Sequence, residues 1–192
     1  MRAVMAAGLM VWACAVSASA QTVFGQKPAL GASLTVNKPS ESALGDARMT
    51  ISPNFRLVPR KGLGVSWGLS WFETNRFNFA NIGGDNIEGR LRIRPVMVGA
   101  SYTFGEDKTF LSLSTVAGIA FNRTRDGGGV SIDNSFAVRP GVGFWHSLHP
   151  RFGLTAFGGY VITRPDITAG GVTRSLKADY ATFSVGGAFV LF

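Results

Sequence analysis

The chain has 192 residues, with 25 glycines, one cysteine and a formal net charge of +8 at pH 7. A single cysteine cannot form an internal disulfide. The basic residues are scattered, with no run longer than Arg60-Lys61. The positive charge therefore does not indicate a nucleic-acid-binding surface, and the length is that of one domain.

Residues 1–20 have the order of a cleaved secretory signal peptide. Arg2 is followed by an apolar stretch, Ala3 to Val16, and then by Ala18-Ser19-Ala20. This charged, apolar and small-residue order is typical of a signal with an A-x-A cleavage site. The apolar stretch is too short for a helix that spans a membrane. We therefore expect residues 21–192 to form the mature domain.

Cys14 lies within this segment, so the mature chain would contain neither a cysteine nor a thiolate metal site. An alternative is a lipoprotein in which Cys14 carries the lipid. The preceding Val11-Trp12-Ala13 fits that alternative poorly, because it lacks the small residues that such a site needs.

Eight segments of the remaining chain alternate with a period of two, which indicates strands with two different faces. They cover residues 28–37, 47–58, 62–74, 90–104, 108–121, 134–146, 151–163 and 177–192. Each is long enough for a tilted strand to cross a bilayer, which takes about 9–11 residues. Strands in soluble proteins average only about five or six residues.

The first three segments place large apolar residues on one face and small or polar residues on the other. In the third, the apolar face carries Leu63, Val65, Trp67, Leu69 and Trp71, and the opposite face carries Gly62, Gly64, Ser66, Gly68 and Ser70. The apolar faces of the first two segments carry Leu30, Leu34, Val36, Met49, Ile51 and Phe55.

The fourth segment departs from this pattern. Arg92 and Arg94 share the face on which Val96 and Val98 follow. If the arginines face the interior and the valines face lipid, the facing must switch near Pro95, most simply through a β-bulge. A proline there would also fail to donate to the strand ladder.

The fifth to seventh segments alternate again, whereas the eighth offers two apolar rows. The stronger row contains Phe183, Val185, Phe189 and Leu191, and the weaker one contains Ala188, Val190 and Phe192. The register of the last strand is therefore open, and a bulge is one alternative.

The connections between these segments alternate in length. The second, fourth and sixth are short: Pro59-Arg60-Lys61, Gly105-Glu106-Asp107 and Ser147 to Pro150. The others are long and polar: Asn37 to Asp46, Asn75 to Gly89, Asn122 to Asp133, and Arg164 to Leu176. Short turns at one rim and long loops at the other are typical of transmembrane barrels, on the periplasmic and extracellular sides respectively.

A soluble eight-stranded barrel would have to place the large side chains inside. Its interior holds little more than its own side chains, so six or more such strands would overfill it. We therefore predict an all-β fold, an eight-stranded antiparallel up-and-down transmembrane β-barrel with the large residues facing lipid. Aromatic residues near strand ends are candidates for girdles at the two membrane interfaces; they are Trp67, Trp71, Tyr102, Phe104, Phe144 and Trp145.

The signal peptide, the eight segments, the rhythm of the connections and the terminal Phe189-Val190-Leu191-Phe192 together resemble the outer-membrane β-barrel domain family. Small eight-stranded barrels of the outer membrane protein A and outer membrane protein X type belong to it. The resemblance covers the mature chain and rests on architecture, with no family-specific motif. It implies a place in the outer membrane of a Gram-negative bacterium, and recognition of Phe192 by the barrel-assembly machinery.

Three arginines, Arg56, Arg94 and Arg139, are predicted to face the lumen, where pairing or hydration offsets the cost of burying charge. Lys177 and Asp179 are expected near the extracellular rim. One interpretation is a gated polar path through the barrel. The favoured one is a plugged interior whose polar groups are satisfied.

We assign no catalytic residue, cofactor or metal site. The only histidines, His146 and His149, flank Ser147 in a predicted periplasmic turn. A hydrolase needs a base beside its nucleophile, and lipid A lies at the opposite rim. Two glycine-rich stretches, Gly83-Gly84-Asp85-Asn86 and Asp126 to Gly129, lack the ligand spacing of a calcium loop. We therefore expect that the protein is not an enzyme.

The main functional hypothesis is an integral outer-membrane protein with a structural or surface-interaction role through four mobile extracellular loops. Arg123, Arg125, Arg164 and Arg174 are expected to pair with lipopolysaccharide phosphates. A narrow channel for small solutes is the first alternative, and a lipid A-modifying enzyme is the second. We expect membrane lipid and lipopolysaccharide as partners, no nucleic acid, and a monomer.

Overall fold

The structure of the chain is a computed structural model that describes residues 26–41, 44–69, 72–73, 77–82, 85–125 and 129–191. The predicted signal peptide and Phe192 lie outside the described residues. In this described part, no helix is long and apolar enough to span a membrane.

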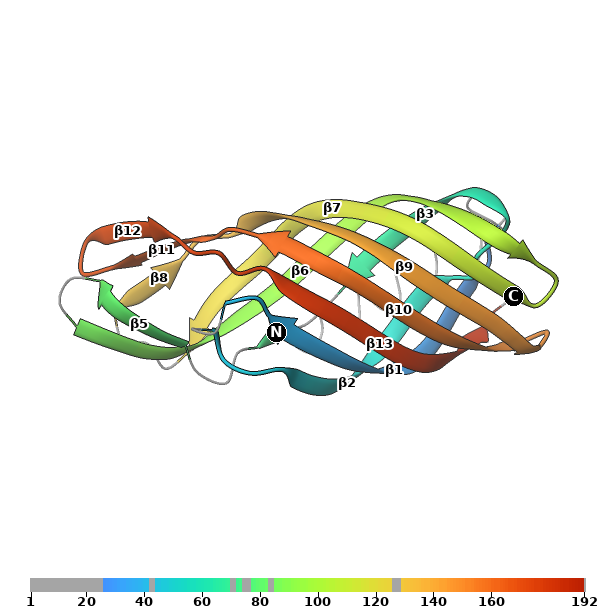
Figure 1. Cartoon of the computed structure of the whole chain (residues 1–192), viewed down its shortest axis with the longest axis horizontal. Helices are drawn as coiled ribbons and strands as arrows, with labels where there is room; N and C mark the ends of the chain where they lie inside the picture. Colours follow the sequence, from blue (N-terminus) through green and yellow to red (C-terminus); the bar gives the residue numbers. More distant parts are fainter. Residues whose placement is uncertain are drawn as a thin grey trace, which may run out of the picture.

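The described structure consists almost entirely of antiparallel β-strands (Figure 1). In chain order they are β1 (Pro28–Pro39), β2 (Arg48–Leu57), β3 (Gly62–Leu69), β4 (Phe72–Glu73), β5 (Phe77–Ile82), β6 (Asp85–Glu106), β7 (Thr109–Arg125), β8 (Val130–Ile132), β9 (Ser135–His149), β10 (Phe152–Thr163), β11 (Asp166–Ala169), β12 (Val172–Ser175) and β13 (Tyr180–Val190).

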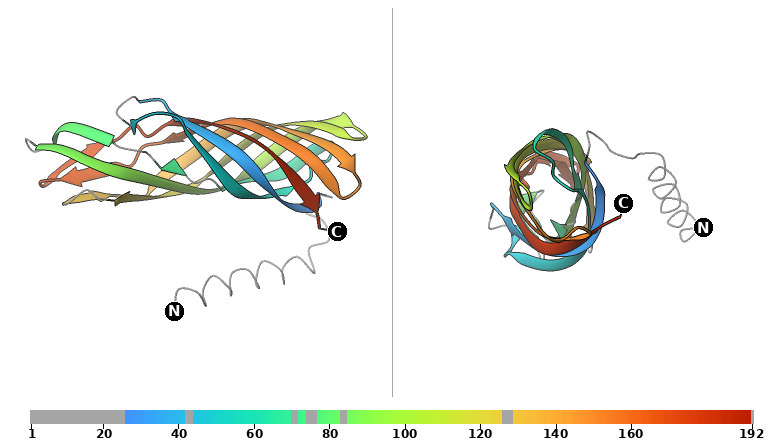
Figure 2. Two further views of the ribbon diagram at one scale, coloured as in Figure 1. Left: turned by 90° about the horizontal axis from the view of Figure 1, so that it is seen from below. Right: turned by 90° about the vertical axis from the view of Figure 1, so that its right-hand side faces the viewer.

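Eight of these strands form the wall of a barrel. Their hydrogen-bonded order is β2-β1-β13-β10-β9-β7-β6-β3, so the first strand lies beside the last, and β4 and β5 pair with β6. Seen from one end, the wall encloses a central space (Figure 2). The predicted all-β, eight-stranded antiparallel barrel is confirmed, and the strands lie close to their predicted bounds.

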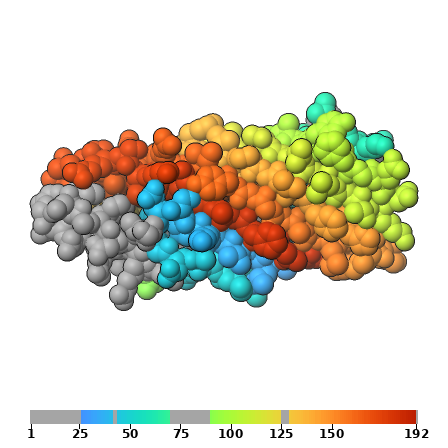
Figure 3. Space-filling view, viewed as in Figure 1, coloured from blue at the N-terminus to red at the C-terminus, as the bar shows by residue number. Residues whose placement is uncertain are grey.

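The two faces of the wall differ as the alternation predicts. The inward residues of the middle of the barrel are mostly small or polar, such as Ser33, Ser101, Thr155 and Thr182. The outward residues are large and apolar, and the strands β1, β13 and β10 form one continuous outer face (Figure 3). Examples of exposed outward residues are Leu30, Leu34, Ile51, Leu63, Val98, Leu113, Val142, Leu154, Phe183 and Val185. Such a surface is favourable against lipid rather than water.

The facing of β6 does not switch at Pro95, so the predicted bulge is wrong. The register with β7 runs without a shift from Arg90↔Arg125 to Glu106↔Thr109. Arg94 is exposed on the outer face, and Ile93 and Met97 are buried inside. Pro95 pairs with Ala120 of β7 and, on its other side, lies between the described pairs with β3 and with β4.

The last strand also keeps one register. β13 pairs with β1 continuously from Ala29↔Val190 to Pro39↔Tyr180. Its stronger apolar row faces outward, with Phe183 and Phe189 exposed, and the weaker row is turned inward. β13 is thus oriented so that its smaller side chains, and not its large apolar ones, lie in the narrow interior.

The two rims differ in length and in structure (Figure 1). The short connections meet near the C-terminus; in one of them Gly105 and Asp107 adopt positive φ angles of 119° and 54°. The opposite rim extends further from the barrel. It contains β5, which pairs with β6, and a three-stranded sheet in the order β12-β11-β8. Three of the four predicted long loops therefore contain strands of their own: β5, β8, and β11 with β12. This extended rim is the one expected to be extracellular from the lengths of the connections.

Candidate functional site: the lumen, its seam and the outer arginines

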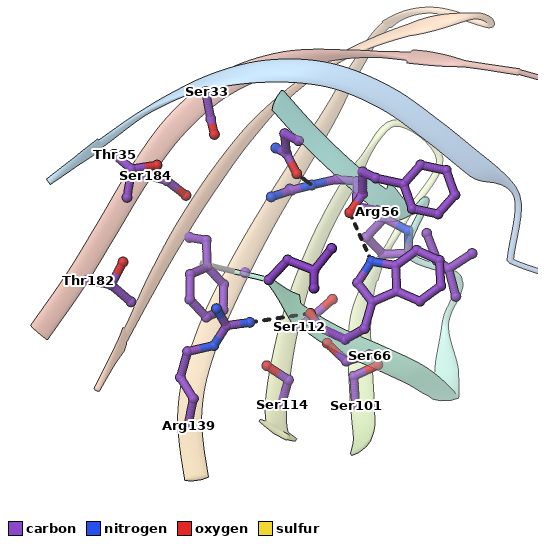
Figure 4. Close-up of a pocket in the computed structure, with 18 of the residues that line it drawn as sticks. Ser33, Thr35, Arg56, Ser66, Ser101, Ser112, Ser114, Arg139, Thr182 and Ser184 are labelled. Carbon is purple, nitrogen blue, oxygen red and sulfur yellow. Dashed lines mark hydrogen bonds between the residues drawn. The ribbon is translucent and has the colours of Figure 1, made fainter. Parts of the chain in front are cut away.

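A cavity of about 260 Å³ lies in the middle of the barrel (Figure 4). Hydroxyl groups line it from several strands, because each strand turns its small polar face inward. Those labelled in Figure 4 are Ser33, Thr35, Ser66, Ser101, Ser112, Ser114, Thr182 and Ser184. Arg56 and Arg139 also line the cavity, as the alternation predicted. Arg94, on the outer face, does not.

Arg139 is held against the wall by apolar and backbone contacts. Its guanidinium carbon lies 4.5 Å from the ring centroid of Phe157, and its Nη2 donates to the carbonyl oxygen of Trp67 at 3.3 Å. A Cβ atom at Gly141 or Gly159 would collide with the ring of Phe157. The glycines on this face therefore make room for an aromatic side chain inside the barrel, a role that the sequence pattern did not reveal.

An apolar cluster closes the lumen on the extracellular side of the cavity. Leu91, Ile93, Val116 and Tyr180 come from the wall and are buried. Leu44 and Ile167, from the first and last long connections, pack into the same cluster. Apolar residues of the long connections thus fill the lumen at the end of the barrel where these connections lie.

A second cluster lies at the short-turn end. It contains Ala29, Trp145, Ala188 and Val190. Trp145 is only 1% exposed, and its Nε1 donates to Ser147 Oγ at 2.8 Å. The prediction that Trp145 joins an interfacial girdle is therefore wrong, whereas Tyr102, Phe104 and Phe144 are exposed on the outer face.

The wall has one seam, between β2 and β3. These strands stand at the two ends of the hydrogen-bonded order, and no ladder joins their described residues. Side chains bridge them instead. Trp67 Nε1 donates to the carbonyl oxygen of Phe55 at 2.8 Å, and the two rings stack with centroids 4.7 Å apart. Gln26, which precedes β1, bonds to β3 as well: its Oε1 accepts from the backbone N–H of Val65 at 2.9 Å.

The cavity reaches this seam. Its lining includes the outward residues Phe55, Trp67 and Leu69 together with the inward residues Ser66 and Arg56. The outward Phe144 of β9 also lines the cavity, but β9 is paired on both sides, whereas no ladder joins the described residues of β2 and β3. The cavity therefore lies beside the part of the wall that side chains hold together.

Outward arginines begin where the apolar outer surface ends. On β6 and β7, Val96 and Ile119 are paired and exposed, and Arg94 pairs with the exposed Phe121. The next outward pair is Arg92↔Arg123. The predicted loop arginines Arg164 and Arg174 are exposed beyond the same rim; the side chain of Arg125 lies outside the described residues.

The two predicted rim residues have defined partners. Lys177 Nζ forms an ion pair with Glu41 Oε1 at 3.4 Å. Asp179 is buried, and its Oδ1 accepts from the backbone N–H of Thr163 at 2.9 Å. Asp179 therefore supplies a hydrogen-bond acceptor for the backbone N–H at the end of β10.

The histidine pair bonds locally. His146 Nδ1 lies 2.8 Å from Thr109 Oγ1, and His149 Nδ1 accepts from the backbone N–H of Arg151 at 3.3 Å. The hydroxyl of Ser147 bonds to Trp145 instead of to either imidazole. Within the described ranges, no three His, Cys, Asp or Glu side chains gather as a metal site would require. Gly83-Gly84 and residues 126–128 of the two glycine-rich stretches, and Trp71, fall outside the described residues.

No protein-family model matches the chain, and no curated protein matches it closely. Solved structures do match. Outer membrane protein OprG from Pseudomonas aeruginosa is 10% identical, with a TM-score of 0.63 over 85% of this chain and 95% of that one. Outer membrane protein W from E. coli is 16% identical, with a TM-score of 0.58 over 86% and 98%.

Neisserial surface protein A is also similar, with 16% identity and a TM-score of 0.57 over 86% of this chain and 97% of that one. All three matches extend over nearly the whole of the described chain and nearly the whole of the matched structure. At such low identity they establish the shape of the chain and not its activity. The chain has the fold of the small outer-membrane β-barrels.

Proposed function

We propose that this chain is an integral outer-membrane protein whose outward arginines at the extracellular border bind the phosphates of lipopolysaccharide. The observation that carries the proposal is the position of Arg94 and Arg123. They follow directly on the last exposed apolar residues of the same outer face, Val96 and Phe121. Headgroup phosphates of an outer leaflet lie at this height relative to the hydrocarbon.

Arg94 and Arg123 are diagonal neighbours on paired strands, since Arg94 pairs with Phe121 and Arg92 pairs with Arg123. Diagonal neighbours on one face of a sheet lie about 7–8 Å apart. Two guanidinium groups at that spacing can donate to one phosphate between them, and such charge-assisted bonds are the strong ones. The proposal differs from the predicted contact through mobile loops, because Arg94 and Arg123 lie on paired strands.

The experiment compares wild type with the double variant Arg94→Gln/Arg123→Gln for binding of intact lipopolysaccharide. Loss of two exposed charge pairs should weaken binding about tenfold, or about 1.4 kcal/mol. The matched control is Arg151→Gln, which removes an exposed arginine at the opposite rim and should leave the affinity unchanged. If the double variant binds as tightly as wild type, or if phosphate-stripped lipopolysaccharide binds wild type equally well, the proposal fails.

A through-going channel receives less support, because apolar clusters bound the cavity on both sides. Single-channel recordings in planar bilayers test it, and a plugged barrel should conduct little. An enzymatic role also receives less support, since the histidines bond to strand-end partners far from the extracellular leaflet. An unchanged lipid A profile with His146→Ala would remove that site from consideration.

A further inference from the structure

The cavity in the middle of the barrel carries two positive charges and no negative one. Arg56 enters from β2 and Arg139 from β9, and none of the residues that line the cavity is an aspartate or a glutamate. Like charges that share one cavity disfavour each other. Buried charges are normally paired or neutralised, because the low dielectric of an interior makes an isolated ion costly. The charge of this cavity therefore calls for a counter-ion.

Hydrogen bonding points the same way. The buried atoms Arg139 Nε and Asn54 Nδ2 have no partner, and both are donors. Arg139 is only 7% exposed, so bulk solvent does not satisfy it. The bonds that the arginines do make are long, 3.3 Å from Arg56 Nε to Asn54 Oδ1 and 3.3 Å from Arg139 Nη2 to Trp67 O. Native structures rarely leave buried donors unsatisfied. What the cavity lacks is an acceptor.

The remaining lining can complete a site for such an acceptor. Figure 4 shows Arg56 and Arg139 approaching from different sides of the cavity, with serine and threonine hydroxyls on the surrounding strands. A hydroxyl rotates to donate to whatever accepts beside it. A guanidinium presents several N–H groups in a fixed fork that matches the oxygens of a carboxylate or phosphate.

We propose that the cavity binds one oxyanion group, a phosphate, sulfate or carboxylate, between Arg56 and Arg139. This site is inside the barrel and separate from the outward Arg94 and Arg123. The group can arrive as a free ion or at the head of an amphiphile. An amphiphile would pass its apolar part through the seam between β2 and β3, where Phe55, Trp67 and Leu69 line the cavity.

The test uses the barrel folded in micelles of an uncharged detergent, with inorganic phosphate as one probe and decanoate as the other, at constant ionic strength. The ¹⁵N–¹H signal of Arg139 Nε, assigned by its loss in Arg139→Met, should shift saturably with at least one probe. Arg56→Met should weaken that binding about tenfold or more, because a hydrogen bond to a charged group is lost. Arg151→Gln, which removes an exposed arginine at the short-turn rim, should leave it unchanged.

Thermal unfolding gives a second readout that does not depend on signal assignment. A bound anion stabilises only the folded state, so the probe that binds should raise the unfolding temperature of wild type but not of Arg139→Met. Arg139→Met should itself fold, as judged by heat modifiability on gels, since it removes a buried charge that lacks a counter-ion.

The two probes separate the sources of the anion. Binding of phosphate identifies a site for free oxyanions. Binding of decanoate alone, with decanol inactive, identifies an amphiphile that uses the seam. The proposal is overturned if neither probe shifts the Arg139 signal, or if both stabilise Arg139→Met as much as wild type.

Discussion

Two parts of the barrel wall are built in different ways. Between β6 and β7 the backbone ladder is unbroken from Arg90↔Arg125 to Glu106↔Thr109. Between β2 and β3 no ladder joins the described residues, and the side chain of Trp67 bonds to the backbone of Phe55 instead. Ser101 of β6 and Ser112 of β7 line the central cavity, as do Phe55 and Trp67 at the seam. The two parts of the wall therefore differ in the bonds that hold their strands together and not in whether the cavity lies beside them.

A narrow barrel can therefore hold two neighbouring strands together without a backbone ladder. A backbone ladder cannot be opened at one place without orphaning N–H and C=O groups in lipid. A side-chain bridge can open by a rotamer change and leaves fewer groups unsatisfied. The following substitutions disturb first the sealed wall, then the seam, and finally the turn that ends the seam.

The largest effect is expected from Gly99→Ala in the sealed wall. An added Cβ would collide with the backbone of Thr115 and Val116 on β7, so the paired strands must move apart. Overpacking of this kind costs about 1–3 kcal/mol. The free energy of unfolding in urea, measured in phospholipid vesicles, should fall by that amount. Ala100→Val, one residue away on the outer face, is the control and should change it by less than about 0.5 kcal/mol. Equal effects would show that the close approach is not a constraint.

A smaller loss is expected from Trp67→Phe in the seam. The substitution keeps an aromatic ring beside Phe55 but removes the Nε1–H that donates to the Phe55 carbonyl. Loss of one such bond costs about 1 kcal/mol. The same unfolding measurement should record it, and Tyr102→Phe, which removes the hydroxyl of an outward aromatic on the sealed wall, should have almost no effect. Equal stability of Trp67→Phe and Tyr102→Phe would show that the Nε1–H bond does not stabilise the seam.

The smallest effect is expected at the turn between β2 and β3. Lys61 Nζ forms an ion pair with Glu106 Oε1 at 2.9 Å, and both side chains are exposed. The hydrogen bond and charge of Lys61 lower the pKa of Glu106 below its ordinary value of 4.5. The hydrogen bond and charge of Glu106 raise the pKa of Lys61 above 10.5. The pair joins the start of β3 to the end of β6.

The sign of the pH dependence follows from these directions. A lowered carboxylate pKa stabilises the folded barrel above pH 4.5, and this contribution is lost as the pH falls through the lowered folded-state value. Unfolding curves of wild type and Glu106→Gln should therefore differ slightly at neutral pH and converge under acid conditions. A difference that instead grows toward low pH would contradict the ion pair as its source.

Much of the fold follows from the sequence because a membrane barrel has a simple alternation. Large residues such as Leu63 and Leu69 can face only lipid, and their glycine and serine neighbours can face only the narrow interior. This logic places Arg56 and Arg139 in the lumen correctly. The register of β13 also follows it, once the stronger apolar row is assigned to lipid.

The same logic fails above the membrane. Beyond the lipid, the outer surface meets water and the interior meets the folded connections, so charged residues face outward and apolar ones inward. Arg94 and Ile93 obey this second rule. The outward residues of β6 change from apolar to charged near Pro95 because the medium outside the barrel changes there. The strand itself keeps the same facing. Alternation in the sequence does not show at which residue a strand leaves the lipid, and so it does not show where charged residues begin to face outward.

The seam and the inward Trp145 were beyond sequence reasoning for a different reason. Which neighbouring strands lack a ladder depends on the closure of the whole barrel, and no local pattern encodes it. The unsatisfied donors of Arg139 and Asn54 likewise appear only when strands distant in sequence are brought together.

The pairing of Ile132 with Ile167 joins two surface connections through one small sheet. Because Ile167 belongs to the same buried cluster as Leu44 of a third connection, a change in any one of these connections is expected to disturb the others. The tip formed by Gly170 and Gly171, with positive φ angles of 55° and 79°, stands outside this linkage and is exposed. This tip is therefore where an epitope tag is expected to be inserted with the least harm to the barrel.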